Sequence, residues 1–374
     1  MTSPGDARLL DTFLTAVRID SPSGEEGAFA RWCVERLRAL GCEVRLDESA
    51  STTGSDTGNV IAELPATAEG KTIVLSAHLD TVEPGRGIEP IVEGGVVRSA
   101  GDTVLGSDDK AGVAAILEAL ACMQESPRPH ARVRVLLTTS EEVGLQGSRA
   151  LAVPDCEGDL CLVLDAAGAV GGIVTAAPTH YVFSAVFEGM AAHAGVQPEK
   201  GRSAVLMAAR AIATMLLGRL DDETTSNVGE IRGGGATNIV PSRCTLSGEC
   251  RSIDAARVEE VRESMDAAMR TAAQEAGGGV EVRWTREYEG YRFADDDPAI
   301  LIVASAMRSA GFEPRLFVTG GGSDANAFAS KGLSAIALSC GMTDVHGTGE
   351  SIAVQDMVSL VAVILATIDQ AVAS

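Results

Sequence analysis

The stretch TIVLSAHLD, residues 72–80, decides the fold of this 374-residue chain. It begins with a short apolar run and ends in His78 and Asp80. A short apolar run that is bounded by polar or turn residues is typical of a buried strand. Three further runs have the same character: VRVLLTT (133–139), LCLVL (160–164) and SAIALSC (334–340). Because helical segments separate the runs, they predict an α/β fold, a mostly parallel sheet with helices on both faces.

Helical patterns surround these strands. Apolar residues recur at helical spacing in residues 7–17, and Ser23 is a candidate N-cap for a second helix that Gly41 would end. Two more helices are expected at about residues 324–330 and 356–372, on either side of the last apolar run. These elements belong to one domain.

The middle of the chain has a different pattern. Strands that are exposed on one face alternate with two long helices in the order βαββαβ, which is typical of a ferredoxin-like α+β unit. The segments are YVFSAVFEG (181–189), a helix at 203–217, NVGEIRG, RCTLSGECRSI, a helix at about 255–276, and VEVRWTREYEG. We therefore expect an inserted lid domain at residues 178–290. Residues 1–177 and 291–374 would form the α/β domain.

Composition excludes several partners. The formal charge is −22, from 52 acidic and 30 basic residues, which argues against nucleic acid and against anionic membranes. No apolar run reaches the roughly 18 residues of a membrane helix, and the N-terminal residues do not resemble a signal peptide. The eight cysteines have no metal-binding spacing and are typical of reduced thiols. We expect a cytoplasmic protein with no nucleic-acid or membrane partner.

Residues with metal-binding chemistry follow every apolar run. Sites in open α/β sheets form beyond the carboxyl ends of the strands, so these side chains should meet at one edge. One further acid lies in GSDDKAG (106–112), where an apolar helix begins. The candidate residues are His78, Asp80, Asp108, Glu141, Glu142, Asp165 and His346.

Imidazoles and carboxylates in these numbers suit two divalent ions with one shared carboxylate, a common device for hydrolysis. Neighbouring side chains such as Glu141 and Glu142 point in different directions, so one can bind a metal while the other takes a proton from water. Asp80 lies on the same face of an extended segment as His78 and is expected to accept a hydrogen bond from its second ring nitrogen. Each residue taken singly also suits an ordinary helix cap or solvated surface. Together they favour the metal site.

The ordered motifs resemble a known family. AHLDT (77–81), GSDDKAG (106–112), SEEVG (140–144), LDA (164–166) and VHGTGE (345–350) are similar to motifs of the dinuclear zinc exopeptidases and deacylases, and most to those of peptidase T and its relatives. The resemblance covers essentially the whole chain, including the lid. It implies a metallopeptidase with two divalent ions, zinc or alternatively cobalt or manganese.

The resemblance also implies a role for each residue. His78 and Asp165 would bind one ion, Glu142 and His346 the other, and Asp108 would bridge both. Glu141 would be the general base and Asp80 the partner of His78. Asp108 is preferred to Asp109 as the bridge because the first aspartate of the motif bridges in the family, and a cis peptide bond is expected between them. Asp109 and Lys110 are interpreted as capping and ion-pairing residues.

The lid matches the family as well. AAHAGVQPEKGRSA (191–204) resembles the segment whose histidine reaches the active site, so His193 would donate to the oxyanion. Asn238 and Arg251 match positions that hold the substrate's backbone or carboxylate, which suits a planar guanidinium. GGGSDANAF (320–328) lacks the lysine and spacing of a phosphate loop. We interpret its residues Gly321, Gly322 and Ser323 as contacts to the substrate backbone.

The reaction implied by the resemblance is hydrolysis of a peptide bond in short peptides, with removal of the N-terminal residue from tripeptides favoured. Carboxypeptidase, dipeptidase or N-acyl-amino-acid deacylase action on the same scaffold is the alternative, because fold and metal site do not set specificity. A binding module without catalysis is disfavoured by the complete set of ligands. The oligomeric state is left open between a monomer and a homodimer formed through the lid.

Overall fold

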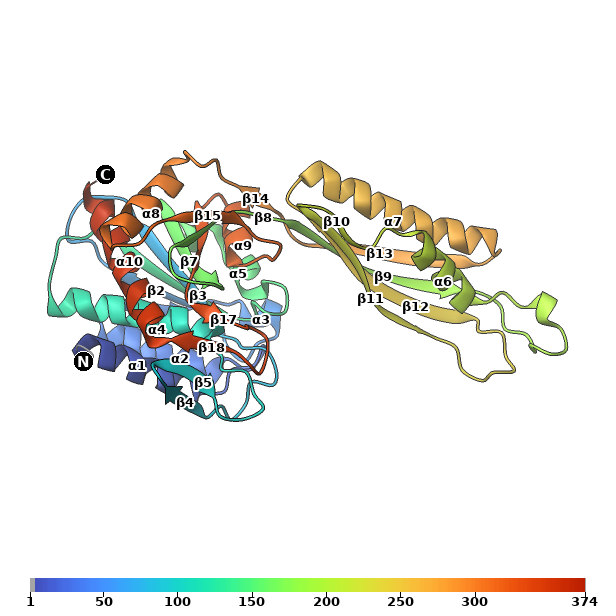
Figure 1. Cartoon of the computed structure of the whole chain (residues 1–374), viewed down its shortest axis with the longest axis horizontal. Coiled ribbons are helices and arrows are strands. Elements are labelled where there is room, and N and C mark those ends of the chain that lie inside the picture. The colour runs from blue at the N-terminus through green and yellow to red at the C-terminus, as the bar shows by residue number, and fades with distance from the viewer. Residues whose placement is uncertain (1–3, 374) are drawn as a thin grey trace. The chain divides into compact units, whose positions relative to one another are not determined.

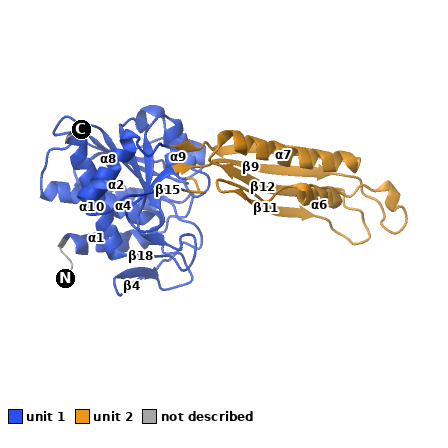
Figure 2. Cartoon of the chain, turned by 45° about the horizontal axis from the view of Figure 1, so that its top comes forward, with its two compact units in different colours: residues 1–175, 293–318, 323–374 blue, residues 176–292, 319–322 orange. Residues whose placement is uncertain are grey.

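The chain forms two compact units in the computed structural model, which describes residues 4–373 (Figures 1 and 2). Unit 1 comprises residues 1–175, 293–318 and 323–374. Unit 2 comprises residues 176–292 together with the short return 319–322. The inserted domain expected from the sequence, 178–290, lies within unit 2, but the return at 319–322 was not expected.

A mixed sheet forms the centre of unit 1. Its strands follow the order β1-β2-β6-β3-β7-β16-β8-β14, where β14 is the short strand Tyr291–Arg292, and β15 also pairs with β8. The bounds are β1 Glu43–Leu46, β2 Val60–Leu64, β6 Val133–Thr138, β3 Ile73–His78, β7 Leu160–Ala166, β16 Ala335–Ser339, β8 Gly172–Ala177 and β15 Arg315–Val318. The four strands predicted from apolar runs are β3, β6, β7 and β16, and they pair in parallel. The flanking strands β1, β2 and β8 pair antiparallel.

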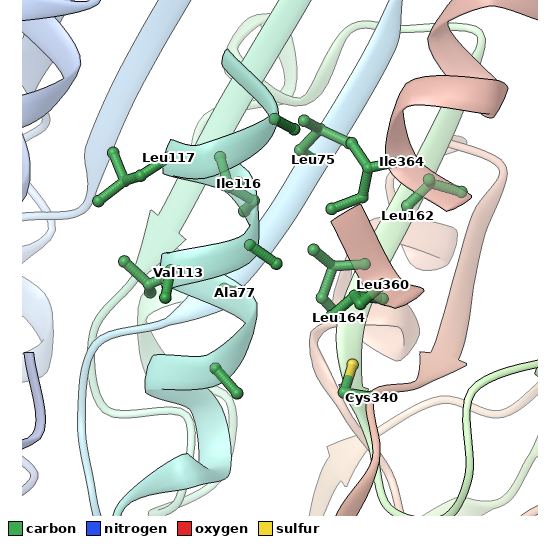
Figure 3. Packing of buried hydrophobic residues seen from close by; sticks show 14 of the residues in the cluster. Leu75, Ala77, Val113, Ile116, Leu117, Leu162, Leu164, Cys340, Leu360 and Ile364 are labelled. Atoms are coloured by element: carbon green, nitrogen blue, oxygen red, sulfur yellow. The ribbon is translucent and has the colours of Figure 1, made fainter. Parts of the chain in front are cut away.

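Helices cover both faces of this sheet, as the sequence predicts. The bounds of the unit 1 helices are α1 Pro4–Val17, α2 Gly27–Ala39, α3 Ala50–Thr53, α4 Ser107–Glu125, α5 Gln146–Ala150, α8 Pro298–Ser309, α9 Asp324–Ser330 and α10 Val354–Ala373, with a 3₁₀ turn at Val153–Cys156. On one face, α4 and α10 pack apolar side chains into the main core, among them Ile116 of α4 and Leu360 of α10 (Figure 3). The other face carries the short helices α5 and α9.

The start of α4 lies close against the sheet. A Cβ atom on Gly112 would lie 2.7 Å from the main-chain oxygen of Leu164 in β7. Only glycine allows this approach without a clash. The contact sets the distance between the first turn of α4, which carries Asp108, and the end of β7, which carries Asp165.

The C-terminal helix α10 is the most apolar of the long helices. By length and composition alone, its stretch Val354–Val372 is long and apolar enough to cross a membrane, which the apolar runs did not lead us to expect. Within its most apolar 18-residue stretch, 50% is buried inside the fold. Leu360 and Ile364 pack in the main core (Figure 3). This packing is typical of a core helix.

A small antiparallel sheet in unit 1 was not predicted. Its strand order is β17-β18-β5-β4. The bounds are β4 Pro90–Glu93, β5 Val96–Ser99, β17 Met342–Thr343 and β18 Ser351–Ala353. The loop between β17 and β18 contains His346 and Glu350, so this sheet holds both ends of the loop that carries them.

Unit 2 is an antiparallel sheet with two helices on one face (Figure 2). Its strand order is β10-β11-β12-β9-β13. The bounds are β9 Thr179–Glu188, α6 Ala204–Thr214, β10 Gly218–Asp221, β11 Thr224–Gly233, β12 Arg243–Ser252, α7 Ala255–Glu275 and β13 Gly279–Tyr288, with a 3₁₀ turn at Pro198–Lys200. The short strand β14 that follows β13 in the chain is not part of this sheet and pairs with β8. The predicted order βαββαβ is present, with β10 as an additional strand. The helix expected at 203–217 ends at Thr214, because the chain turns there to enter β10.

Candidate metal centre

The strand ends of unit 1 bring the predicted ligands together. Three sets of side chains each place their potential ligand atoms within 4.8 Å of one another. Asp108 is shared by two of the sets, one with each of two histidines. The sets are His78 with Asp108 and Asp165, His78 with Glu141 and Glu142, and Asp108 with Glu142 and His346.

Asp108 faces the two histidines with its two carboxylate oxygens. Its Oδ1 lies 3.0 Å from Nε2 of His78, and its Oδ2 lies 3.3 Å from Nε2 of His346. Asp165 lies on the His78 side, with 3.7 Å between its Oδ1 and Nε2 of His78. Glu142 lies on the other side, with its Oε1 3.0 Å from Nε2 of His346. One carboxylate therefore lies between two imidazoles, each of which has a second acid beside it.

The partner of the other ring nitrogen of His78 differs in detail from the prediction. Nδ1 lies 2.9 Å from the main-chain oxygen of Asp80 and 3.5 Å from its Oδ1. The carboxylate of Asp80 instead accepts the backbone N–H groups of Glu141, at 2.9 Å, and Glu142, at 3.2 Å. Asp80 therefore orients the imidazole mainly through its carbonyl and uses its side chain to hold the loop after β6.

The peptide bond between Asp108 and Asp109 is cis, as predicted. Asp109 is buried and turns away from the three sets: its Oδ2 accepts the N–H of His78 at 3.2 Å, and its Oδ1 accepts that of Gly112 at 3.1 Å. Asp109 is thus a capping residue, as expected. The expectation that Lys110 forms an ion pair is wrong, because its Nζ donates to the carbonyl of Ile19 at 2.6 Å in a fully buried position.

The loop after β6 has a constrained backbone. Ser140 precedes Glu141 and has a φ of +53°, in the left-handed region that costs free energy for a residue other than glycine. Two buried carboxylates hold this loop, Asp80 and Glu26. Oε1 of Glu26 accepts the backbone N–H of Ser140 at 2.9 Å. Sequence reasoning missed Glu26, and the only signal was a second acid in SPSGEEG, next to the expected N-cap Ser23.

Electrostatics make the centre suitable for cations. Burial and repulsion from Asp108 raise the pKa of Asp165 to about 8. Burial also raises the pKa of Glu141 and that of Glu142 above their usual range. Hydrogen bonds to Asp108 and Glu142 raise the pKa of His346 to about 10. Carboxylates crowded in a low dielectric are stabilised by positive charge, so oxygen and imidazole donors arranged in this way fit divalent ions.

Two of the predicted substrate residues lie side by side in unit 2. His193 pairs with Ile239 in an isolated bridge, and the backbone N–H of Ala194 donates to the main-chain oxygen of Asn238 at 2.8 Å. Both His193 and Asn238 are exposed. These two side chains are therefore available to a ligand on the surface of unit 2.

The guanidinium of Arg251 is held within unit 2. Its Nη2 and Nε donate to Glu249 at 2.9 and 3.2 Å, and its Nη1 donates to the hydroxyl of Tyr288 at 3.2 Å. The ring of Tyr288 in turn lies against Gly322, where a Cβ would come within 2.3 Å of it. Gly322 and Arg251 thus both lie against Tyr288, which the sequence did not indicate.

The last predicted contacts belong to different units. Gly321 and Gly322 lie in unit 2, whereas Ser323 lies in unit 1. The hydroxyl of Ser323 caps α9 and accepts the N–H of Ala325 at 3.3 Å. Its structural role is therefore that of a helix cap.

Comparison with known proteins identifies similar chains. The chain is 38% identical over 366 residues to the Bacillus subtilis protein YqjE, covering 98% of this chain and 99% of that one. The solved structure of aminopeptidase PepT from Bacillus cereus is 39% identical, with a TM-score of 0.92 over 99% of both chains. A tripeptidase from Staphylococcus aureus is 35% identical, with a TM-score of 0.95 over 99% of both chains.

The sequence pattern of peptidase family M20/M25/M40 matches residues 74–370, which include all the candidate ligands. The chain is thus a peptidase of the peptidase T type, with a mixed sheet between helices. It belongs to peptidase family M20/M25/M40.

Proposed function

We propose that this peptidase removes the N-terminal residue from short peptides, with tripeptides as the favoured substrates. The observation that carries the proposal is Asp108, whose two oxygens face His78 at 3.0 Å and His346 at 3.3 Å, with Glu141 in the same cluster. The two similar structures are described as an aminopeptidase and a tripeptidase, which supports the choice of substrate.

The proposed centre holds two divalent ions. His78 and Asp165 would bind one ion, Glu142 and His346 the other, and Asp108 both. Zinc is the first choice, and cobalt or manganese suits the same donors. When bound, such ions supply Lewis-acid chemistry: they make water more acidic and polarise a scissile carbonyl.

Glu141 is the proposed general base. Its carboxylate takes a proton from the attacking water and passes it to the leaving amine. Asp80 supports this role, because its Oδ1 holds the backbone N–H of Glu141 at 2.9 Å and limits how the side chain is presented. A base that is fixed close to the reacting water contributes about 10²- to 10⁴-fold to a rate.

Residues of unit 2 are the proposed substrate contacts. His193 donates to the oxyanion, and the neighbouring Asn238 binds the substrate backbone. Arg251 binds a carboxylate with its guanidinium, which Glu249 and Tyr288 hold in a fixed orientation. The glycines 321 and 322 and Ser323 contribute backbone contacts. We also propose that the enzyme acts in the cytoplasm, as a monomer or as a homodimer formed through the lid.

A small substrate panel tests the proposal against carboxypeptidase, dipeptidase and deacylase action. The panel contains a tripeptide, its N-acetyl form, its C-terminal amide and an N-acyl amino acid, each with zinc, cobalt or manganese. An aminopeptidase cleaves the tripeptide and its amide but not the acetylated form. Cleavage of the N-acyl amino acid, or loss of activity on the amide, would instead establish one of the alternatives.

A further inference from the structure

We infer that Glu350 is a positioning residue of the metal centre: its buried carboxylate ties the loop that carries Asp108 to the loop that carries His346. Glu350 is 2% exposed and belongs to none of the three sets of potential ligands. The inference rests on the proposed function, because it concerns the same two ions.

The carboxylate of Glu350 is surrounded by donors from the start of α4. Its Oε2 accepts the backbone N–H groups of Leu105 at 2.7 Å and Gly106 at 2.8 Å. Its Oε1 accepts the hydroxyl of Ser107 at 2.6 Å and the backbone N–H of Asp108 at 3.0 Å. Each oxygen thus accepts two hydrogen bonds. One of the four donors is the backbone N–H of Asp108, the proposed bridging residue.

Glu350 reaches these donors from the loop between β17 and β18. Its own backbone N–H donates to the carbonyl of Gly347 at 3.1 Å, in the turn that directly follows His346. His346 itself has a φ of +64°, so its orientation depends on the surrounding contacts. A displacement of Glu350 would therefore be transmitted to Asp108 on one side and to His346 on the other.

The chemistry of these contacts requires a carboxylate. A glutamine side chain has one oxygen acceptor and one NH₂ donor group. In Glu350→Gln, an NH₂ group replaces one of the two oxygens. The two donors that face that oxygen would then be buried N–H or O–H groups without an acceptor. The variant keeps the volume of the side chain, so its effect reports on the loop rather than on a cavity.

A matched control lies on the same helix. Glu118 is also buried (4% exposed), lies in α4, and receives two hydrogen bonds from Arg8 at 2.7 and 2.8 Å. Glu118→Gln removes a buried carboxylate of α4 but changes no contact of the Leu105–Asp108 loop. A general loss of stability would appear in both variants, whereas a loss of metal affinity is expected only in Glu350→Gln.

Metal binding is the measured quantity. Purified wild type, Glu350→Gln and Glu118→Gln are titrated with zinc against a chromophoric chelator, and their cobalt forms are compared by visible absorption. Wild type and Glu118→Gln should bind two ions with the same affinities. Glu350→Gln should bind at least one ion about 10- to 100-fold more weakly, the cost typical of losing an outer partner of a ligand, with a changed cobalt spectrum.

Each other outcome has a distinct meaning. Wild-type affinities and an unchanged cobalt spectrum in Glu350→Gln would overturn the inference and leave the proposed function intact. Failure of the wild type to bind zinc or cobalt would overturn the proposed function itself. If Glu350→Gln does not fold, Ser107→Ala is measured in the same way, because it removes only one of the donors. Weaker binding in Ser107→Ala supports the inference, and wild-type binding overturns it.

Discussion

Asp80 connects the proposed general base with a proposed ligand. Its Oδ1 accepts the backbone N–H of Glu141 at 2.9 Å and lies 3.5 Å from Nδ1 of His78. Its Oδ2 accepts the hydroxyl of Ser23 at 2.6 Å, so both oxygens have partners in a fully buried position. One side chain therefore influences both the orientation of the imidazole and the backbone from which Glu141 projects.

Asp80→Asn tests this connection. The amide retains the size of the carboxylate, but its NH₂ group replaces one of the two oxygens and cannot accept a hydrogen bond. The N–H of Glu141 loses its acceptor if Oδ1 is replaced, and the hydroxyl of Ser23 loses its acceptor if Oδ2 is replaced. We expect kcat to fall about 10- to 100-fold, as is typical when an outer partner of a metal site is changed. Peptidase assays measure kcat, and the zinc content is determined on the same preparation. Asp369→Asn, an exposed acid of α10, is the control. An unchanged kcat in Asp80→Asn would contradict the role.

Glu141→Gln separates catalysis from metal binding. Glutamine cannot take the proton from water, so kcat should fall by about 10²- to 10⁴-fold. The zinc content should stay at that of the wild type, because the proposed ligands are unchanged. Steady-state kinetics and metal analysis of the same preparation check both points. Full activity in the variant would show that another group is the base.

Asp108 and Asp109 are adjacent, but their side chains make different contacts. Asp108→Ala removes the carboxylate that faces both histidines and should abolish most zinc binding and activity. Asp109 accepts the N–H of His78 with one oxygen and that of Gly112 with the other, and Asp109→Asn keeps one of these two acceptors. Because Asp109 belongs to none of the sets of potential ligands, the variant should affect zinc affinity less. Zinc titration of both variants measures the difference. Equal losses of affinity would contradict the assignment of Asp108 as the bridge.

The parallel strands were predictable because of their burial. β3 and β6 are buried along their whole length, so each appears in the sequence as a continuous apolar run. The small sheet was not predictable. Its strand β4 is mostly exposed and β17 has only two residues, Met342–Thr343, so neither has a recognisable apolar period. Short and exposed strands depend on tertiary neighbours that the sequence does not reveal.

The clustering of the candidate ligands was predictable because of their position after the strands. His78 and Asp165 end or follow apolar runs, and the topology of a parallel sheet brings such ends together. The choice of Asp108 over Asp109 came from family resemblance. Glu350 ends the motif VHGTGE, but neither the motif nor its spacing indicated a role for it. Its partners are mainly backbone N–H groups far away in the sequence, such as that of Asp108, which is 242 residues away. Hydrogen bonds to the backbone leave no pattern of side-chain types.

Removal of metal should destabilise the protein. The centre crowds the largely buried carboxylates of Asp108, Glu142 and Asp165, where cations reduce their mutual repulsion. A ligand at 100 times its Kd stabilises the folded state by about 2.7 kcal/mol. We expect Tm to fall after chelation and to recover on addition of zinc, as measured by differential scanning calorimetry. Asp108→Ala should show a smaller shift. An unchanged Tm in the wild type would argue against a tightly bound metal.

His193→Ala tests the proposed donor of unit 2. Loss of one donor to an oxyanion typically lowers kcat by about 10²- to 10³-fold. Zinc content and Tm should not change, because His193 is exposed and belongs to none of the potential ligand sets. Glu199→Ala, an exposed residue that follows in the same segment, is the matched control and should retain wild-type kcat. If kcat of His193→Ala equals that of the control, stabilisation of the oxyanion must come from another group.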